Sequence, residues 1–484
     1  MAKKSWEIDN FLAENQNQLF IGGVSAIELA EQYGTPLFVF SESRIRQNIN
    51  RLKEVENVID CPLKICYAAK ANSNMAILRT VREAGSDIEV NSGGELWKVL
   101  KIGFSGDQII FNGTSKEVWE IEDAIKAEIY AIQVDSLFEL SLIEETAERL
   151  NKSANVSLRL VPEIETNTHS GLQTALLTSK FGMMPDESLA AFHQYKNSEF
   201  INLKGIHLHI GSQNPEPAPY AEALKTLFEN LVQIYKETGL KLSHLNLGGG
   251  FPVNYLLDNS HSVDFPAEQH EMFSADFTPG NAVENAWLIV KKAARDSNAV
   301  ELLENITLLL EPGRSVISDA GICLTTVRNK KERPIYESGV KDSSSRLPTP
   351  DSRLSTDSWL LTDAGFNILL SMETYKWYYH LISAERAGEI HNFPYKVAGP
   401  LCDGGDVYFD IEGAGRLPEH RLLPENVAVG ETLALLNCGA YSIAQMFQYN
   451  GRFLPAAVLV NQNSEIELIR KRDRFEDLIN NDCF

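Results

Sequence analysis

The chain has 484 residues, 44% of them hydrophobic, which is long enough for more than one hydrophobic core. Acidic side chains outnumber basic ones by 66 to 44, and the net charge of -22 excludes nucleic acid and anionic membranes as principal partners. The sequence begins MAKKSWEIDN and contains no apolar stretch long enough to span a bilayer, so we expect a cytoplasmic protein without a membrane partner. The six scattered cysteines form no CxxC pair, and we expect neither a disulfide framework nor a metal site.

The N-terminal segment, residues 1–43, is predicted to contain strands. LFVF at 37–40 is a short apolar run of the kind found in strands. Ser41 stands where a helix N-cap residue would, before the helical stretch SESRIRQNINRL. We expect the strands of this segment to join a β-rich domain farther along the chain.

Residues 44–317 alternate between short apolar runs and stretches with helical spacing of apolar residues, such as 77–84. The apolar runs end at Ala69, Val90, Phe111, Val134, Val161, Ile210, Leu247 and Leu310. Eight strand–helix units around one core predict a (β/α)8 barrel of the TIM type, which is an α/β fold.

Residues 318–484 have a different sequence pattern. Strand-like segments such as WLLTD, YKVAG, TLALLN and AAVLVN are separated by Gly and Pro. This pattern predicts a C-terminal antiparallel β domain. Within it, residues 340–358 (VKDSSSRLPTPDSRLSTDS) contain too few apolar side chains to pack against a core. We expect a mobile surface loop there, or a disordered tag-like insertion.

Residues at the carboxyl ends of the eight runs should meet at one face of such a barrel. The reactive, polar or glycine residues at these ends are Lys70, Glu89, Ser92, Arg159, His209, Gly248, Gly249, Gly250 and Glu311. The amine of Lys70 could form a Schiff base or simply meet solvent. His209 could stack on a flat ring or be a hydrogen-bonded core histidine.

The same face also combines a candidate anion site with a buried acid. Three successive glycines let backbone N–H groups approach a phosphate, although a glycine run alone is more often a tight turn. Glu311, in EPGRS, ends an apolar strand, where an acid needs a partner such as an arginine. An amine, an anion site and a buried acid are what pyridoxal phosphate requires: a Schiff-base lysine, a phosphate cradle and a partner for the pyridine nitrogen.

Short motifs run through nearly the whole chain. They are YAAKAN, THSG with KFGM, HIGSQ, GGGFP, EPGR, GPLCDGGD, NCGAYS, and YNGR with PAAVLV. In this order they resemble those of the fold-type III pyridoxal-phosphate decarboxylases, the group containing diaminopimelate and eukaryotic ornithine decarboxylases. The resemblance implies a barrel like that of alanine racemase and pyridoxal 5'-phosphate as cofactor.

The resemblance also implies roles for individual residues. The cofactor would contact Lys70, His209, Ser212, Gly248, Gly249, Gly250, Glu311, Gly313, Arg314 and Tyr441. Lys70, His209 and Cys402 would be catalytic, with Cys402 as proton donor unless it is only a small buried hydrophobe. Glu311 would pair with the pyridine nitrogen and favour decarboxylation, since alanine racemases present an arginine there. In this family the cysteine reaches the cofactor of the partner subunit, so a homodimer with shared active sites is implied.

Substrate contacts are implied at Asp403, Arg314, Tyr375 and Tyr441. Asp403 follows the cysteine, where diaminopimelate decarboxylases have glutamate and ornithine decarboxylases have aspartate. Ser371 stands where diaminopimelate decarboxylases carry an arginine for the second carboxylate of the substrate, whereas Tyr375 matches them. Glu89 replaces the aspartate of many members of the family.

These departures, with the aromatic run YKWYY and the long insertion, look most like the bacterial D-ornithine/D-lysine decarboxylase branch. We therefore expect decarboxylation of a basic diamino acid, D-ornithine or D-lysine, to putrescine or cadaverine. One alternative is a meso-diaminopimelate decarboxylase making L-lysine, in which another basic group replaces the missing arginine. Others are a decarboxylase of siderophore or antibiotic assembly and a cofactor-free regulatory homologue, against which the retained Lys70 and Cys402 argue.

Overall fold

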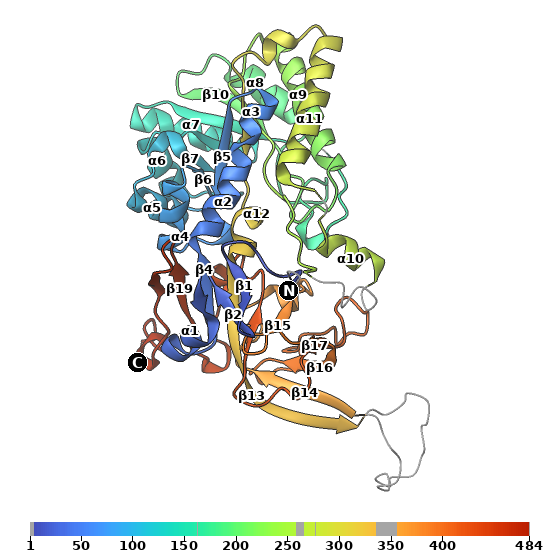
Figure 1. The fold of residues 1–484 in the computed structure, drawn as a ribbon. Coiled ribbons are helices and arrows are strands. Elements are labelled where there is room, and N and C mark those ends of the chain that lie inside the picture. Colours follow the sequence, from blue (N-terminus) through green and yellow to red (C-terminus); the bar gives the residue numbers. More distant parts are fainter. Residues whose placement is uncertain (1–3, 162, 258–265, 276, 335–355, 484) are drawn as a thin grey trace, which may run out of the picture.

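The computed structural model describes residues 4–161, 163–257, 266–275, 277–334 and 356–483. A helix-covered barrel occupies one end of the molecule and β-sheets occupy the other (Figure 1). The barrel strands are β5 (Leu63–Ala68), β6 (Asp87–Val90), β7 (Ile109–Phe111), β8 (Ala131–Val134), β9 (Ala154–Arg159), β10 (Ile201–His207), β11 (His244–Asn246) and β12 (Thr307–Leu310). They close in the order β10-β11-β12-β5-β6-β7-β8-β9, every neighbour parallel. The predicted (β/α)8 barrel is confirmed.

Helices surround the barrel on its outer face (Figure 1). They are α2 (Glu42–Lys53), α3 (Val55–Ile59), α4 (Met75–Glu83), α5 (Gly93–Ile102), α6 (Val118–Lys126), α7 (Leu137–Leu150), α8 (Pro185–Tyr195), α9 (Ala218–Thr238), α10 (Ala267–Phe273) and α11 (Pro279–Asp296). Ser41 begins α2 as expected, because its hydroxyl accepts the Arg44 N–H at 3.2 Å. Each helix turns an apolar stripe inward and closes the core over the strands.

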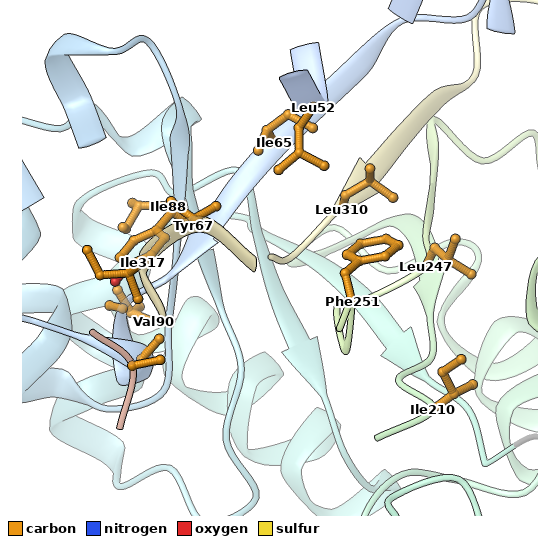
Figure 2. Packing of buried hydrophobic residues seen from close by; sticks show 14 of the residues in the cluster. Leu52, Ile65, Tyr67, Ile88, Val90, Ile210, Leu247, Phe251, Leu310 and Ile317 are labelled. Carbon is orange, nitrogen blue, oxygen red and sulfur yellow. The ribbon is translucent and has the colours of Figure 1, made fainter. Parts of the chain in front are cut away.

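The barrel core is packed by branched and aromatic side chains from successive strands. Leu52 of α2 lies beside Ile65 of β5, and Phe251 lies near Leu247 and Leu310 (Figure 2). The same cluster of buried residues continues into the β domain, where it includes Phe38. Barrel and β domain therefore share one apolar core at their junction.

The β domain is built on a sheet with the order β17-β16-β14-β13-β4-β19-β20. Its strands are β4 (Leu37–Ser41), β13 (Gly321–Pro334), β14 (Thr356–Thr362), β16 (Phe393–Ala398), β17 (Arg421–Leu423), β19 (Ala456–Val460) and β20 (Ile466–Arg470). Strand β18 (Thr432–Leu435) pairs with β13 and with β15 (Leu381–Ser383).

The β domain differs from the expected antiparallel one in two of its strand pairs. β4 is parallel to β19 and β14 is parallel to β16, so the sheet is mixed. Parallel neighbours need a long connection between them, and both pairs are separated by many residues of chain. The remaining pairs are antiparallel, as predicted.

The strands before residue 44 do not all join this sheet. Only β4 does, whereas β1 (Leu12–Asn15), β2 (Gln18–Ile21) and β3 (Val24–Ser25) form a small antiparallel sheet of their own, followed by α1 (Ala26–Tyr33). A second buried cluster, with Leu19 and Ile322 among its members, packs this small sheet against the large one. The expected loop at 340–358 lies outside the described residues up to 355, and its last three residues begin β14.

A buried ion pair connects the loops that leave β7 and β8 at the carboxyl ends of the strands. The Lys116 ammonium donates to the Gly113 and Gln133 carbonyl oxygens at 2.7 and 2.9 Å and pairs with Glu139 at 2.5 Å. The other Glu139 oxygen accepts the Asp135 N–H at 2.9 Å. Both charged side chains are almost fully enclosed, so neither can exchange its partner for water.

We expect Lys116→Met to lower thermal stability markedly, because Glu139 would remain as a buried carboxylate without its cation. Loss of one partner of a buried pair costs about 3–5 kcal/mol. The double variant Lys116→Met/Glu139→Leu should recover part of the lost stability. As a control, Lys126→Met breaks an exposed ion pair with Glu122 and should lower the free energy of unfolding by about 1 kcal/mol or less. Scanning calorimetry of the four proteins measures this; equal midpoints for Lys116→Met and Lys126→Met would contradict the assignment.

Candidate active site

A cavity of about 350 Å³ opens at the carboxyl ends of the barrel strands. It is lined by Lys70, Asn91, Asn112, Gly113, Arg159, Gly171, Leu172, Thr174, Phe181, His207, His209, Ser212, Glu311, Arg314, Ser371, Tyr375, Tyr441 and Gln445. Asn91, Asn112, Arg159, His207 and Glu311 end or directly follow a barrel strand, and the last four residues of the lining come from the β domain. The barrel and the β domain therefore form this cavity together.

Lys70 brings an amine into the cavity from the end of β5. It sits in a short 3-10 turn between the buried residues Ala69 and Ala71, while its own side chain is 43% exposed. Its ammonium lies 3.8 Å from the Glu89 carboxylate. Burial would lower the pKa of Lys70, but the charges of Glu89, Tyr441 and others raise it overall.

Two buried carboxylates, Glu89 and Glu311, share one amide in the cavity floor. The Asn112 side-chain nitrogen donates to Glu89 at 2.8 Å and to both Glu311 oxygens at 3.1 and 3.0 Å. Glu311 also accepts a bond from the Asn246 amide at 2.7 Å and faces the His207 ring at 3.5 Å. Glu311 thus has the larger number of donors.

The pKa values of the two acids are shifted in opposite directions. Burial, reinforced by the Glu311 charge, raises the pKa of Glu89 to about 7 although Lys70 opposes the shift. Burial would also raise the pKa of Glu311, but His207 and the Asn246 hydrogen bond lower it overall. Glu311 is therefore ionised near neutral pH, as a partner of a protonated ring nitrogen must be.

The glycine run after β11 forms a tight loop against the neighbouring strand end. Gly248 and Gly250 adopt φ values of 66° and 88°, which favour glycine, and a Cβ on Gly250 would lie 2.0 Å from the Gly211 carbonyl oxygen. The Gly249 N–H donates to Nδ1 of His209 at 3.1 Å. Burial lowers the pKa of His209, so its ring is neutral and held by this bond.

Arg314 and Ser212 form the polar wall next to the glycine loop. The guanidinium donates from Nε and Nη2 to the Ser212 hydroxyl, both at 3.2 Å, and from Nη1 to the Tyr255 hydroxyl at 2.9 Å. It stacks over the rings of Trp377 and Tyr441 at 4.3 and 4.9 Å. Gly313, just before it, leaves room for the Tyr441 hydroxyl 3.5 Å from where a Cβ would be.

Cys402 and Asp403 lie outside this cavity, unlike the other predicted catalytic and substrate-binding residues. Both are exposed on a β-domain turn, where the Cys402 N–H donates to Asn450 at 2.7 Å. Asp403 accepts the Gly405 N–H at 2.9 Å and the Tyr449 hydroxyl at 3.3 Å. Within one chain, the structure therefore does not bring the predicted proton donor to Lys70.

Sequence reasoning missed three residues that govern the charge of Glu311. Asn112 directly follows the third apolar run, so its place at a strand end was an available signal. His207 and Asn246 end their strands as polar residues inside apolar runs, where only the closed barrel shows that they face Glu311. Across the ranges that the structure describes, no group of three or more His, Cys, Asp or Glu could hold a metal, and no helix is apolar and long enough to cross a bilayer.

Glu89 gives a pH-dependent prediction for the protein stripped of pyridoxal phosphate. Its folded-state pKa lies above the ordinary value of 4.5, so its protonation stabilises the fold, and this contribution is lost as pH rises from about 4.5 through about 7. This fall in the free energy of unfolding is on the order of 3 kcal/mol, and Glu89→Gln should abolish it. Thermal midpoints of both proteins, measured at several pH values, test this. The exposed Glu229→Gln serves as control; a wild-type-to-variant difference that is constant with pH would contradict the prediction.

The cavity fits pyridoxal phosphate. Asn91 and Gln445 line it, and each has a buried side-chain atom without a hydrogen-bond partner among the described residues, so the cavity is shaped for a polar occupant. The open amine of Lys70 can hold an aldehyde and the ionised Glu311 can face a pyridinium. These features belong to the residues themselves and do not depend on the motif comparison.

Comparison with known proteins gives the same answer. The family model for the pyridoxal-dependent decarboxylase, pyridoxal binding domain, matches residues 43–318. Diaminopimelate decarboxylase from Methanocaldococcus jannaschii is 34% identical over 96% of this chain and 95% of its own length. The enzyme of the same name from Aquifex aeolicus is 32% identical, over 98% and 97%.

Solved structures extend the likeness to three dimensions. The crystal structure of diaminopimelate decarboxylase from M. jannaschii with L-lysine superposes with a TM-score of 0.80 at 32% identity, covering 98% of both chains. These relatives are diaminopimelate decarboxylases, so the expected D-ornithine/D-lysine branch is not shown. Fold, cavity and relatives agree on the broader assignment: the chain belongs to the pyridoxal-dependent decarboxylase family, and it is a carboxy-lyase that uses pyridoxal phosphate.

Proposed function

We propose that the protein decarboxylates meso-diaminopimelate to L-lysine. The observation that carries this proposal is the similarity to diaminopimelate decarboxylases over 96% or more of the chain, which includes both the barrel and the β domain. Tyr375, which lines the cavity, matches the motif of these enzymes. The expected D-ornithine/D-lysine activity becomes the second candidate.

Each of these cavity residues has a different role in decarboxylation. When bound, pyridoxal phosphate supplies a sink for the electron pair left by the departing CO2. Lys70 holds the cofactor, and Glu311 keeps a proton on the pyridine nitrogen because its own donors keep it ionised. His209 would lie against the ring, while Ser212 and Tyr441, with the glycine loop, would hold the phosphate.

We further propose that the active form is a homodimer in which Cys402 serves the partner's cavity. Decarboxylation ends with delivery of a proton to carbon, and a thiol can supply it. Because Cys402 is exposed on a turn away from its own cavity, a second copy is the source of the missing donor. Asp403, the next residue, would enter the same neighbouring site and bind an ammonium group.

Ser371 supports the second candidate, a decarboxylase of D-ornithine or D-lysine. It lines the cavity where a diaminopimelate decarboxylase would carry an arginine. Arg314 already donates to Ser212 and Tyr255, and Arg159, the other arginine that lines the cavity, lies over the Phe181 ring at 4.3 Å. A substrate with one carboxylate needs no such group. A cofactor-free regulatory role fits poorly with an assembled set of Lys70, Glu89 and Glu311.

The substrate is tested by CO2 release from the holoenzyme with meso-diaminopimelate, D-lysine, D-ornithine and the L-forms in parallel. We expect kcat/KM to be highest for meso-diaminopimelate, by about tenfold or more, because its distal ammonium and carboxylate both find partners. Preference for D-lysine or D-ornithine would transfer the assignment to the second candidate. Turnover of none of them would leave a conjugated amino acid, as in siderophore or antibiotic assembly.

Shared sites are tested by mixing two inactive variants, Lys70→Ala and Cys402→Ala. After subunit exchange, each hybrid dimer contains one cavity with both an intact lysine and an intact cysteine, so about a quarter of wild-type activity should return. Mixing either variant with Lys70→Ala/Cys402→Ala provides the control, which should restore nothing. Failure of the first mixture to regain activity, with exchange verified by mass spectrometry, would contradict a cysteine supplied by the partner.

A further inference from the structure

A second cavity, of about 710 Å³, lies in the β domain and shares no residue with the active-site cavity. It is lined by Thr35 and Pro36 just before β4, by the middle of β13, by the end of β14 and by the segments 399–401 and 451–453. Leu361, Ile368, Leu401, Phe453 and Phe475 give it apolar walls. The large sheet thus has a hollow next to the turn that carries Cys402.

Three arginines line this hollow against one carboxylate. Arg328, Arg452 and Arg472 face it, and Asp363 is the only acidic residue among the lining residues. Arg328 pairs with Asp363 at 2.7 Å. Arg452 and Arg472 have no carboxylate within 4.0 Å among the residues that the structure describes, so neither forms an ion pair there.

Asp363 cannot neutralise the two remaining arginines, because its oxygens are already used. One accepts the Thr325 hydroxyl at 2.7 Å and the Thr326 N–H at 3.0 Å. The other accepts the Thr35 hydroxyl at 2.7 Å in addition to the arginine. A register shift in β13 between Val327 and Asn329 forms a bulge at residue 328, and bulges of this kind redirect a side chain.

The two unpaired guanidinium groups are held in place by backbone carbonyls. Arg472 donates from Nη2 to Pro36 at 2.7 Å and to Tyr33 at 3.3 Å, and Arg452 donates to Pro400 at 2.9 Å. Burial lowers the pKa of Arg472, although the charge of Asp363 opposes this shift. Each guanidinium has further N–H groups for a ligand.

We propose that this hollow binds a small organic polycarboxylate, which bridges Arg452 and Arg472 and places its carbon skeleton against the apolar wall. Arginine forks bind carboxylates with charge-assisted, bidentate hydrogen bonds. The apolar residues around them favour an organic anion over an inorganic one. The site is distinct from the decarboxylation cavity, and its ligand is neither substrate nor cofactor.

The same geometry couples the hollow to Cys402. Pro400 and Leu401, in its wall, directly precede the cysteine, and Asn450, which accepts the Cys402 N–H, directly precedes the other wall segment. A bound anion competes with the Pro400 carbonyl for the Arg452 guanidinium. Occupancy therefore changes the contacts on both sides of the Cys402 turn, at Pro400 and at Asn450. It thereby alters the rate of proton delivery, the step proposed for Cys402.

Binding is tested by calorimetric titration of the holoenzyme with citrate at fixed ionic strength, because mobile ions screen such charges. We expect saturable binding that Arg452→Gln and Arg472→Gln each weaken about tenfold or more, whereas Arg149→Gln on the barrel helix α7 leaves it unchanged. Pyrophosphate should bind more weakly than citrate. Absence of citrate binding, or equal binding by all four proteins, would overturn the proposal; tighter binding of pyrophosphate would overturn the choice of a carboxylate.

Arg452 also keeps the test decisive if Arg472→Gln fails to fold, since the Arg452 side chain is exposed and bonds to one carbonyl only. Arg452→Lys should retain part of the citrate affinity. Saturating citrate should change the kcat of the wild-type enzyme about twofold or more and leave that of Arg452→Gln unchanged. Citrate binding with no change in kcat would overturn the coupling to Cys402. Because calorimetry needs no turnover, the outcome does not depend on the identity of the decarboxylation substrate.

Discussion

The active site depends on one shared amide, that of Asn112, which donates to both Glu89 and Glu311. Two carboxylates enclosed in a barrel raise each other's pKa, and burial raises both further. The two pKa values separate because the two carboxylates have different hydrogen-bond partners. Glu311 has an additional donor on β11 and faces an imidazole, whereas Glu89 accepts the amide and lies 3.8 Å from the Lys70 ammonium. One acid is thereby fixed as an anion and the other titrates near neutrality.

The closed barrel is what makes this arrangement possible, and the β domain completes it. The residues around Lys70 are held from outside the barrel: the Tyr441 N–H donates to the Ala71 carbonyl at 2.8 Å, and the Asn72 amide donates to the Gly439 carbonyl at 3.2 Å. The continuous apolar core across the junction makes these contacts rigid. The two parts of the chain therefore act as one unit, although their secondary structure differs.

The sequence predicted the barrel and the strand-end residues because the βα repeat fixes both. Lys70, His209 and Glu311 could be placed at one face without any knowledge of side-chain contacts. Asn246 could not, since a polar residue in an apolar strand shows no local sign of what it faces. The parallel pairing of β4 with β19 was missed for a related reason, because strands so far apart in the chain leave no pattern that relates them.

The resemblance to the family assigns Cys402 to the partner's cavity, and its position outside its own cavity bears on how the substrate is chosen. The distal end of a substrate would meet Ser371 and Tyr375 of one subunit and Asp403 of the other, so its recognition is divided between two surfaces. For meso-diaminopimelate, the aspartate can take the ammonium while the two hydroxyls donate to the carboxylate. Neutral donors bind a carboxylate more weakly than a guanidinium does. Serine in place of arginine would therefore weaken substrate binding and leave unchanged which bond is broken. With the proposed roles, specificity would therefore be a matter of affinity at the distal end, whereas Lys70 and the two unequal acids would act at the reacting carbon.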